Sequence, residues 1–496
     1  MTLRDYHQLT SHSGASVRSA AHGLDWDNQP LPFKIYPDLQ GIPLPSDLPG
    51  SQRPALAALA GSGSGPPRAP DVATLAHLLY FSAGVLRRRT YPGGSIFYRA
   101  AACTGALYHV DAYLAVGTLP GADAGLYHFG AHDFALRRLR EGDQRAHLVA
   151  ATAAEPRVTG APALLVLTST FWRNAWKYRA RTYRHAFWDA GTLLANLLAV
   201  AAALDVPAHV VTGFVDDAIA RLLDVDMARE VPLAVVALGA GGSPAPPPPP
   251  LATLAYPTLP LSREEVSYPI LAEAHAASSL ASPEDVQAWR GRPEALPPAT
   301  GTSPIPLAAL APDTVREPIE AVIVRRGSAR RFSHAAIPLQ ALATILHAAG
   351  TPVPLDVHAR STCYLIANAV DDLPSGAYVV GSDGGLECLR RGDFRRDAGF
   401  LGLGQELPAD AAASLYWLID LDTVFARLGD RGYRVAQLEA AVAGGRTYLA
   451  AYALGLGATG LTFFDDDVTR FFSPHAAGKS VMFHMAVGRR AGRVRA

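Results

Sequence analysis

The sequence predicts an α+β protein made of two tandem copies of one domain. Its 496 residues exceed the size of one ordinary domain and fit two domains of about 200–250 residues each. Hydrophobic residues make up 49% of the chain and charged residues 18%, which leaves enough apolar material for two buried cores. Helical spacing, as in Leu75, Leu78 and Leu79, occurs alongside short strand-like runs such as Tyr113–Val116.

An internal repeat supports the prediction of two copies. Three landmarks occur twice and in the same order. They are Gly125–Gly130 with Gly142, repeated as Gly376–Gly381 with Gly392; Arg181–Arg184, repeated as Arg431–Arg434; and Gly213–Asp217, repeated around Thr462–Asp466. The intervals 392 − 142 and 431 − 181 both equal 250 residues. A shared interval indicates a duplicated domain.

Composition divides the chain into four segments. They are an N-terminal arm that wraps the body (1–70), a first domain (71–240), a linker that could also cover a ligand site (241–315) and a second domain (316–496). The arm is rich in Pro, Gly and Ser, with Leu24–Trp26 and Pro32–Lys34 as expected anchors. The linker starts with a stiff polyproline spacer at Pro246–Pro250 and contains a predicted helix near Glu284–Trp289.

Four arginines fall within the seven residues Arg325–Arg331, and Ser328 lies between them. A guanidinium is a planar, permanently charged fork that matches phosphate oxygens, and the hydroxyl adds a neutral donor. Such a cluster could hold the phosphate of a cofactor if the backbone turns it inward. The alternative is a solvated basic face of a helix.

The pattern Arg-x-Ser-x-Arg-x-Phe at Arg326–Phe332, followed by a polar turn and an apolar helix that ends at Gly350, resembles the opening of the FMN-dependent nitroreductase superfamily. Gly327 departs from it, since the family often has a second basic residue there. The resemblance implies a central mixed or antiparallel sheet flanked by helices in each copy. It also implies that the ribityl phosphate of FMN is bound by Arg326, Ser328 and Arg330, with Arg489 as a further ligand.

The segment Ala102–Tyr108 places small residues and a glycine before a predicted strand. Such residues at a helix start let backbone N–H groups approach a flat ligand closely. SagB-type azoline dehydrogenases carry Pro-Ser-Ala-Gly-Ala-Leu-Tyr here, and this chain is similar, departing at the start of the motif. The resemblance implies that the flavin is lined by Cys103, Thr104, Gly105 and Ala106. An ordinary helix start is the alternative, and Cys103 is expected to be a packing residue because no partnering histidine and carboxylate are evident.

Lys177 and Tyr178 precede Arg181 and Arg184 on what the sequence predicts to be one helical stretch. Nearby positive charge disfavours a protonated lysine, which would move Lys177 towards work as a general base. The alternative is a surface lysine beside a core tyrosine. In the SagB-type enzymes that this segment resembles, a Lys-Tyr pair is assigned to catalysis, which implies catalytic roles for Lys177 and Tyr178.

Nitroreductase-like enzymes are homodimers with flavins at the interface, so the resemblance implies a fused pseudo-dimer. The second copy keeps the arginine cluster, and the first keeps the small-residue loop and Lys177-Tyr178. We therefore expect one composite FMN site, with Thr462 and Phe463 contributed by the second copy, and a vestigial mirror site. The expected function is an FMN-dependent dehydrogenase or oxidase that removes a hydride and a proton from a C–N or C–C bond of an azoline-like or peptide-derived substrate. The alternatives are an NAD(P)H-dependent nitro or quinone reductase and a flavin-free binding or scaffold protein.

Other patterns argue against further partners. Lys+Arg and Asp+Glu are equal at 44 each, so neither nucleic acid nor an anionic membrane is expected as a partner. Three widely spaced cysteines and the absence of a secretory signal suit the cytoplasm, and the fused protein could pair again as a homodimer. No metal is expected, because His128 and His132 fall in a strand–turn–strand segment. Gly455–Gly460 spells a dinucleotide fingerprint in the wrong order of elements and is interpreted as a helix end.

Overall fold

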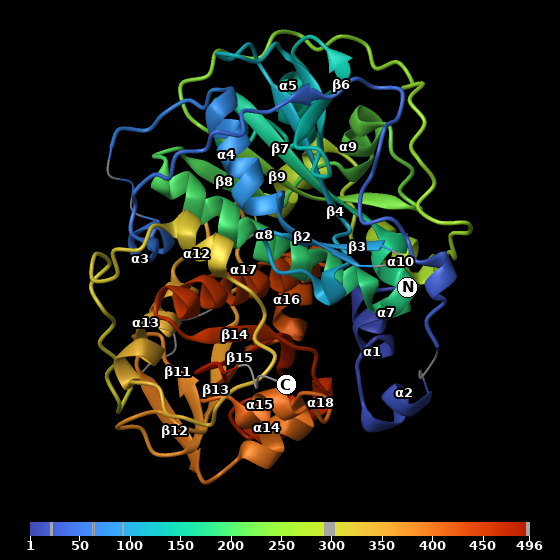
Figure 1. The fold of residues 1–496 in the computed structure, drawn as a ribbon. Coiled ribbons are helices and arrows are strands. Elements are labelled where there is room, and N and C mark those ends of the chain that lie inside the picture. Colours follow the sequence, from blue (N-terminus) through green and yellow to red (C-terminus); the bar gives the residue numbers. More distant parts are fainter. Residues whose placement is uncertain (20–22, 62, 64, 92–93, 292–302, 493–496) are drawn as a thin grey trace.

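Two sheets with the same strand order lie on opposite sides of a central pair of long helices (Figure 1). The computed structural model describes residues 1–19, 23–61, 63, 65–91, 94–291 and 303–492. The first sheet runs β1 (Ile42–Pro43), β6 (Ala135–Glu141), β5 (Gly125–Gly130), β4 (Val110–Val116), β7 (Ala163–Thr170), β9 (Glu230–Leu238), β8 (Ala208–Val211). The second runs β12 (Leu386–Arg391), β11 (Gly376–Val380), β10 (Thr362–Ala367), β13 (Ala413–Ile419), β15 (Ser480–Gly488), β14 (Gly457–Gly460). Apart from β1 the orders are identical and neighbouring strands are antiparallel, so the predicted duplication of an α+β domain is confirmed.

Helices cover both faces of each sheet. The first domain contains α4 (Val72–Ala83), η2 (Thr104–Ala106), α5 (Arg145–Ala151), α6 (Pro156–Thr159), α7 (Phe171–Tyr178), η3 (Arg179–Arg181), α8 (Thr182–Ala203) and α9 (Asp216–Leu223). The second contains α12 (Ile319–Arg325), α13 (Leu339–Gly350), α14 (Arg395–Leu401), α15 (Glu406–Asp410), α16 (Leu421–Leu428), α17 (Arg431–Ala453) and α18 (Asp465–Phe472). Strand β7 is apolar throughout because Leu165 and Leu167 pack towards α8, while Leu164 and Val166 pack with the α5 and α9 side.

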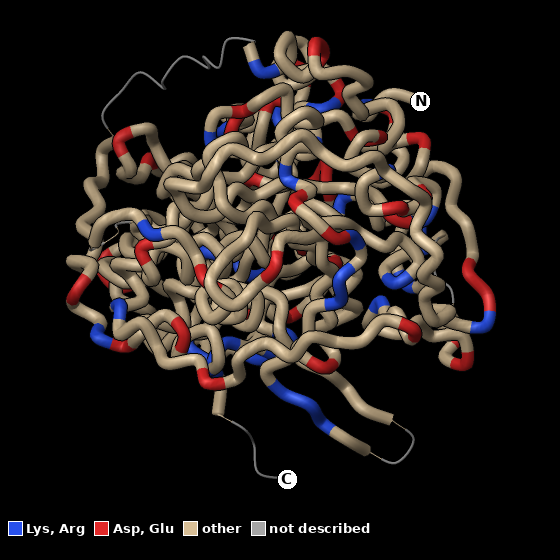
Figure 2. The backbone as a smooth tube through the Cα atoms, turned by 90° about the horizontal axis from the view of Figure 1, so that it is seen from above, with Lys and Arg blue, Asp and Glu red and all other residues tan. Residues whose placement is uncertain are grey.

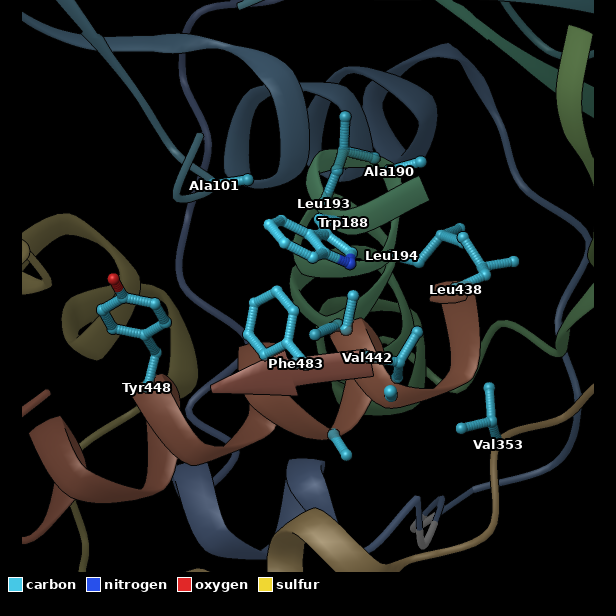
Figure 3. Packing of buried hydrophobic residues seen from close by; sticks show 14 of the residues in the cluster. Ala101, Trp188, Ala190, Leu193, Leu194, Val353, Leu438, Val442, Tyr448 and Phe483 are labelled. Carbon is cyan, nitrogen blue, oxygen red and sulfur yellow. The ribbon is translucent and has the colours of Figure 1, made fainter. Parts of the chain in front are cut away.

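The long helices α8 and α17 cross at the centre and join the two domains (Figure 1). Small residues allow the close approach. A Cβ added at Gly191 would lie 2.5 Å from the Cβ of Ala441, and one added at Gly445 would lie 2.4 Å from the Cβ of Ala195. Because 441 − 191 and 445 − 195 both equal 250, each glycine faces its own counterpart in the other copy. The domains are therefore related by a pseudo-twofold axis through this crossing, as the two chains of a symmetric dimer are. Figure 3 shows Leu194 of α8 beside Leu438 of α17 in the shared core.

Buried ion pairs cross the same junction in both directions. Arg181 and Arg184 of the first domain pair with Asp465 of the second. Arg431 and Arg434, at the repeat positions, pair with Asp216 of the first domain. Asp465 opens α18, which has an acidic first turn as predicted, but its carboxylate serves this interdomain contact. The repeated Arg-x-x-Arg landmark thus joins the two copies.

The N-terminal arm contains more structure than its composition indicates. It includes α1 (Leu3–Leu9), α2 (Gly14–Ser19), η1 (Trp26–Asn28), β1 and α3 (Ala55–Leu59). Its expected anchors make contacts: Trp26 packs on Trp176 at 5.3 Å, and Lys34 bonds Glu230 at 2.6 Å and Tyr113 at 2.8 Å. Helix α1 lies at the domain junction, where the Leu3 N–H donates to Asp430. The arm therefore packs against both domains.

The linker follows the arm over the surface. The Leu31 N–H donates to Leu261, and the Leu259 N–H donates to Ile35. Two helices lie within it, α10 (Pro269–Ala277) and α11 (Pro283–Arg290). The second confirms the helix predicted near Glu284–Trp289. Residues 292–302, which the 241–315 assignment includes, lie outside the described residues.

Of two expectations about helices, one is wrong and the other is confirmed. The predicted continuous helix through Lys177 and Arg184 is broken at Arg179, whose φ is +49°. Gly455 follows α17 with φ +73°, which confirms that the glycine-rich fingerprint is a helix end.

The stretch Phe171–Ala203 is long and apolar enough to cross a membrane by composition, but 94% of its most apolar window is buried in the protein. It is a core element of the junction.

Candidate functional site

The arginine cluster splits into an inward and an outward part. Arg326 follows α12, is half-buried, and its guanidinium donates to the carbonyl of Ala100 in the first domain at 2.8 Å. Its Cζ lies 5.4 Å from the ring centre of Tyr448. Its neighbour Arg325 turns the other way and pairs with Glu317. Burial lowers the pKa of Arg326, although a guanidinium stays charged at neutral pH.

The other predicted phosphate ligands lie nearer the surface. Ser328 is exposed and its Oγ lies 3.1 Å from the hydroxyl of Tyr448, which accepts the N–H of Gly460 at 2.6 Å. Arg330 is exposed and makes no ion pair with the described residues. Arg489 is also exposed, and its Nε donates to the Ala336 carbonyl at 2.8 Å. An antiparallel bridge between Phe332 and Arg490 brings the C-terminal segment beside the cluster.

The predicted loop Cys103–Ala106 forms the short helix η2 in a strained conformation. Gly105 has φ +63° and Ala106 has φ +55°. A Cβ at Gly105 would lie 2.8 Å from the Tyr178 hydroxyl, so both space and backbone angle call for glycine there. Asp189 of α8 holds the loop: it accepts the Cys103 thiol at 3.0 Å, and the Thr104 N–H and hydroxyl at 2.9 and 2.8 Å.

His109 completes this cluster on the inner side. Its Nε2 lies 2.8 Å from the Asp189 carboxylate and its Nδ1 lies 2.8 Å from the Ser169 hydroxyl. The expectation that Cys103 has no histidine and carboxylate beside it is therefore wrong. The thiol is nevertheless no nucleophile, because burial and then the Asp189 charge hold the pKa of Cys103 well above its ordinary value. The ligand atoms of Cys103, His109 and Asp189 all lie within 4.8 Å of one another, but hydrogen bonds already engage all three.

The second domain repeats this anchoring device. Glu439 accepts His358 Nδ1 at 2.8 Å and the N–H groups of Ala359 and Arg360 at 2.9 and 2.8 Å. Since 439 − 189 equals 250, Glu439 is the counterpart of Asp189. An acidic residue inside a buried helix, at the same place in both copies, is the sequence signal that would have identified Asp189.

Lys177 and Tyr178 end α7 beside this loop. The Nζ of Lys177 lies 5.3 Å from the ring centre of Tyr178, and Lys177 has no carboxylate partner among the described residues. Burial, followed by the charges of Asp189 and Cys103, raises the pKa of Tyr178, which therefore stays protonated at neutral pH. The arginines expected to act on Lys177 point to Asp465 instead, so their charge is compensated there.

Thr462 and Phe463 lie where β14 leads into α18. The Thr462 hydroxyl is buried without a hydrogen-bond partner among the described residues. Phe463 is fully buried, and its ring centre lies 5.7 Å from that of Trp188 and 5.4 Å from the Arg181 guanidinium. Its side chain is therefore part of the domain junction, and only its backbone could face a ligand. Figure 3 shows Trp188 above Phe483 in the same packing, with Ala101 and Tyr448 at its edge.

A cavity of about 790 Å³ lies at the mirror position of this site. It borders Thr351 and Pro352, whose carbonyls accept from Arg446. Asn196, the counterpart of Arg446 at the 250-residue interval, donates to the Ala100 carbonyl on the Arg326 side. The cavity lining includes Asp205 and His209 but no arginine cluster.

Comparison with known proteins identifies the fold that positions these residues. A model of the nitroreductase family matches residues 130–240 and 323–489, more than half of the chain and one stretch in each domain. The chain belongs to the nitroreductase family. Both of its domains are nitroreductase-like, and together they form an intrachain pseudo-dimer. The family consists of oxidoreductases that in general bind FMN.

Individual nitroreductases and related chains resemble this protein to different extents. A crystal structure of an Anabaena variabilis protein described as a nitroreductase is 26% identical, covers 98% of this chain and 99% of its own, and has a TM-score of 0.77. That likeness covers both domains. A chain of the E. coli microcin synthetase McbBCD complex with truncated pro-MccB17 bound covers 49% of this chain and 92% of its own, at 18% identity and a TM-score of 0.31. A Methanocaldococcus jannaschii protein named as a nitroreductase is 22% identical over 165 residues, which is 33% of this chain and 78% of its own.

The side chains at the Arg326 side fit the flavin that nitroreductases generally bind. The Nε of Arg326 is buried and lacks a hydrogen-bond partner among the described residues, as does the Thr462 hydroxyl. Unpaired buried polar atoms are costly, and both atoms would gain partners from a polar ligand. Arg326 supplies a positive charge that suits a phosphate. These residues could hold FMN.

Proposed function

We propose that this nitroreductase-family protein is an FMN-dependent dehydrogenase or oxidase with one flavin site between its domains. Its substrate is an azoline-like or peptide-derived molecule that loses a hydride and a proton from a C–N or C–C bond. The observation that carries the proposal is the contact between Arg326 of the second domain and Ala100 of the first. It connects the expected phosphate ligands to the segment before the Cys103–Ala106 loop, which lies beside Tyr178, and so supports one site bordered by residues of both copies.

The proposal gives each residue a distinct role. Arg326 and Ser328 bind the phosphate of FMN, and Arg330 and Arg489 close over it from the surface. Cys103–Ala106 lies against the flat ring system with Asp189 fixing its backbone. Thr462 and the backbone of Phe463 bind the ring from the second domain. When bound, FMN supplies a two-electron acceptor.

Lys177 and Tyr178 handle the proton that leaves the substrate. Lys177 Nζ, which no carboxylate among the described residues holds in its charged form, is the general base and accepts the proton when it is neutral. Tyr178 keeps its own proton at neutral pH and donates a hydrogen bond to the reacting heteroatom. Trp26 of the arm, which is 66% exposed and packs on Trp176, offers an apolar surface next to this pair. A substrate ring could lie on it.

Neighbouring arginines provide a matched test of the flavin site. Arg326→Gln removes the inward guanidinium, whereas Arg325→Gln removes an outward one that pairs with Glu317. Each purified variant is titrated with FMN, and binding is measured from the quenching of flavin fluorescence. The affinity of Arg326→Gln for FMN should be reduced about 100-fold, since charge-assisted contacts to the phosphate are lost. Arg325→Gln should stay within about twofold of the parent. Equal affinities in both variants, or no FMN binding by the parent protein, would contradict the composite site and favour the flavin-free alternative.

Substrate oxidation separates the dehydrogenase from a nitro or quinone reductase. In the FMN-loaded protein, Lys177→Ala should slow anaerobic flavin reduction by an azoline peptide about 10²–10⁴-fold, because a general base is lost. Tyr178→Phe should lower the rate less. If NADPH reduces the flavin quickly and Lys177→Ala leaves that rate unchanged, while azolines are inert, the protein is a reductase.

A further inference from the structure

The hairpin of β2 (Val85–Tyr91) and β3 (Gly94–Arg99) stands outside both main sheets. Its strands pair only with each other among the described residues, so each strand keeps one edge of backbone N–H and C=O groups without a ladder partner. Figure 2 shows the hairpin extending from the body, with its consecutive arginines in blue. Open edges of this kind are templates for another strand.

One face of the hairpin is basic and aromatic. The register pairs Arg87 with Tyr98 and Arg89 with Ile96, which places these side chains on one face together with Tyr91. Tyr91 and Ile96 are 48% and 41% exposed. Phe97, on the opposite face, packs on Phe33 of the arm at 4.9 Å. The arm therefore covers one face and leaves the basic face open.

The basic face has no internal counter-charge. Residues 85–99 contain four arginines and no Asp or Glu. Within the part of the chain that the structure describes, Arg87, Arg88 and Arg89 form no ion pair, and Arg88 donates to the Ser95 hydroxyl. The Cζ of Arg87 instead lies 4.4 Å from the ring centre of Tyr98, and this cation–π contact holds the guanidinium in place. The whole chain has 44 basic and 44 acidic residues, so the positive charge of the hairpin is a local feature.

The hairpin also leads directly into the proposed flavin site. Strand β3 ends at Arg99, the next residue offers its carbonyl to Arg326, and Cys103 follows three residues later. The chain from Arg99 to Cys103 spans at most about 14 Å. A peptide bound along the hairpin would therefore have its neighbouring residues near the loop.

We propose that this hairpin binds an acidic, extended segment of the substrate peptide as an added β-strand. The inference rests on the proposed function, since it names the recognition element of a peptide-derived substrate. Carboxylates at alternate positions of the added strand match Arg87 and Arg89, which are two residues apart on one face. A nucleic acid could use the charge but not the unpaired strand edge, so a peptide fits the surface better.

Binding measured without turnover tests the proposal. A fluorescein-labelled peptide of about ten residues with alternating Glu and Thr, long enough to follow the strand, is titrated with the FMN-loaded protein and followed by anisotropy. Three further probes are the same peptide with Lys for Glu, the acidic peptide N-methylated at alternate amides, and single-stranded DNA of equal charge. The acidic peptide should bind, and affinity should fall as NaCl rises from about 50 to 200 mM. The lysine and N-methylated peptides should bind at least about tenfold more weakly.

Matched variants locate the binding surface. Arg87→Gln with Arg89→Gln should weaken the acidic peptide about five- to tenfold. Arg391→Gln with Arg396→Gln removes the same charge from exposed positions of the second domain and should change binding less than about twofold. Equal binding of the N-methylated peptide or of DNA, or equal loss in both double variants, would overturn the proposal. If azolines are oxidised but the acidic peptide does not bind, only this inference fails; if FMN does not bind, the proposed function fails while the peptide result stands.

Discussion

Asp189 shows how one buried carboxylate can set the shape of a loop. It accepts hydrogen bonds from the Cys103 thiol, the Thr104 N–H and hydroxyl, and His109. These donors fix a loop in which Gly105 and Ala106 both adopt left-handed conformations, and that conformation is costly for alanine. Asp189 does not reach the proposed ligand itself, so it is a positioning residue.

Asp189→Asn therefore should damage both stability and flavin binding. The amide replaces one acceptor oxygen with a donor that faces other donors, which should lower the free energy of unfolding by about 2–3 kcal/mol. FMN affinity should fall because the loop loses its restraint. Glu439→Gln is the matched control in the second copy and should cost similar stability while leaving FMN affinity unchanged. Urea denaturation and flavin titration measure the two effects. Equal loss of affinity in both variants would mean that Asp189 acts only through overall stability.

At the scale of elements, the crossing of α8 and α17 depends on where small residues stand. A Cβ at Gly445 would lie 2.4 Å from the Cβ of Ala195 and 3.1 Å from the Cα of Thr192. Packed interiors resist such overlap, so each added methyl must displace a helix backbone. The two helices can approach this closely because Gly191 faces Ala441 and Gly445 faces Ala195.

A methyl exchange tests this packing. Gly445→Ala should lower the free energy of unfolding by about 1–3 kcal/mol because of overpacking. Ala195→Gly in the same chain removes the opposing methyl and should restore most of that loss, apart from the lower helix propensity of glycine. Thermal and urea unfolding of the single and double variants give the coupling free energy between the two substitutions. Additive losses in the double variant would show that the contact does not limit the helix distance.

Lys34, within one of the expected anchors of the arm, is largely covered and pairs with Glu230 of the first domain. Burial alone would lower the pKa of Lys34, but Glu230 and Tyr36 outweigh burial and raise it, so the side chain stays charged. Lys34→Met leaves Glu230 without its cation and should lower the free energy of unfolding by about 3 kcal/mol or more. Lys479→Met, which removes a similar contact to Tyr364 in the second domain, should cost about 1 kcal/mol. Limited proteolysis should cut the arm only in the Lys34 variant, and an intact arm would contradict its role as an anchor.

On the scale of the whole molecule, two symmetric ion-pair clusters make the domains one unit. Burial would raise the pKa of Asp465, but Arg181 and Arg184 outweigh it and hold that pKa well below the ordinary range. Arg431 and Arg434 do the same for Asp216. Because these pKa values are lower in the folded protein, the stabilisation is present above the unfolded value of about 3.9 and is lost as pH falls through the folded value.

Domain pairing should accordingly weaken in acid. Asp465→Asn leaves two buried arginines uncompensated and should lower the free energy of unfolding by about 3–5 kcal/mol at pH 7. The difference from the parent should shrink as pH falls below about 4, since the unfolded parent then takes up a proton at this carboxyl group while the folded parent keeps it ionised. Asp467→Asn, in an exposed pair with Arg470, should cost less than about 1 kcal/mol at either pH. The midpoints of urea unfolding at pH 7 and pH 3 test this prediction. If the stability of the parent and of Asp465→Asn falls in parallel with pH, the ion pairs of Asp465 do not cause the acid sensitivity.

Local pattern determined the duplication and several of the helices and strands, and it supplied the loop and arginine candidates. The repeat interval of 250 residues, the helix ending at Gly350 and the helix end at Gly455 follow from spacing and backbone propensity, which are local properties. The partners of charged groups were decided by tertiary structure: Arg181 and Arg184 face Asp465 and not Lys177, and Cys103 lies beside Asp189 and His109. Which arginine of Arg325–Arg331 turns inward was decided there too. The physical reason is that a buried charge is stabilised by groups far away in sequence, and a single chain's pattern does not encode which distant groups folding will bring to it.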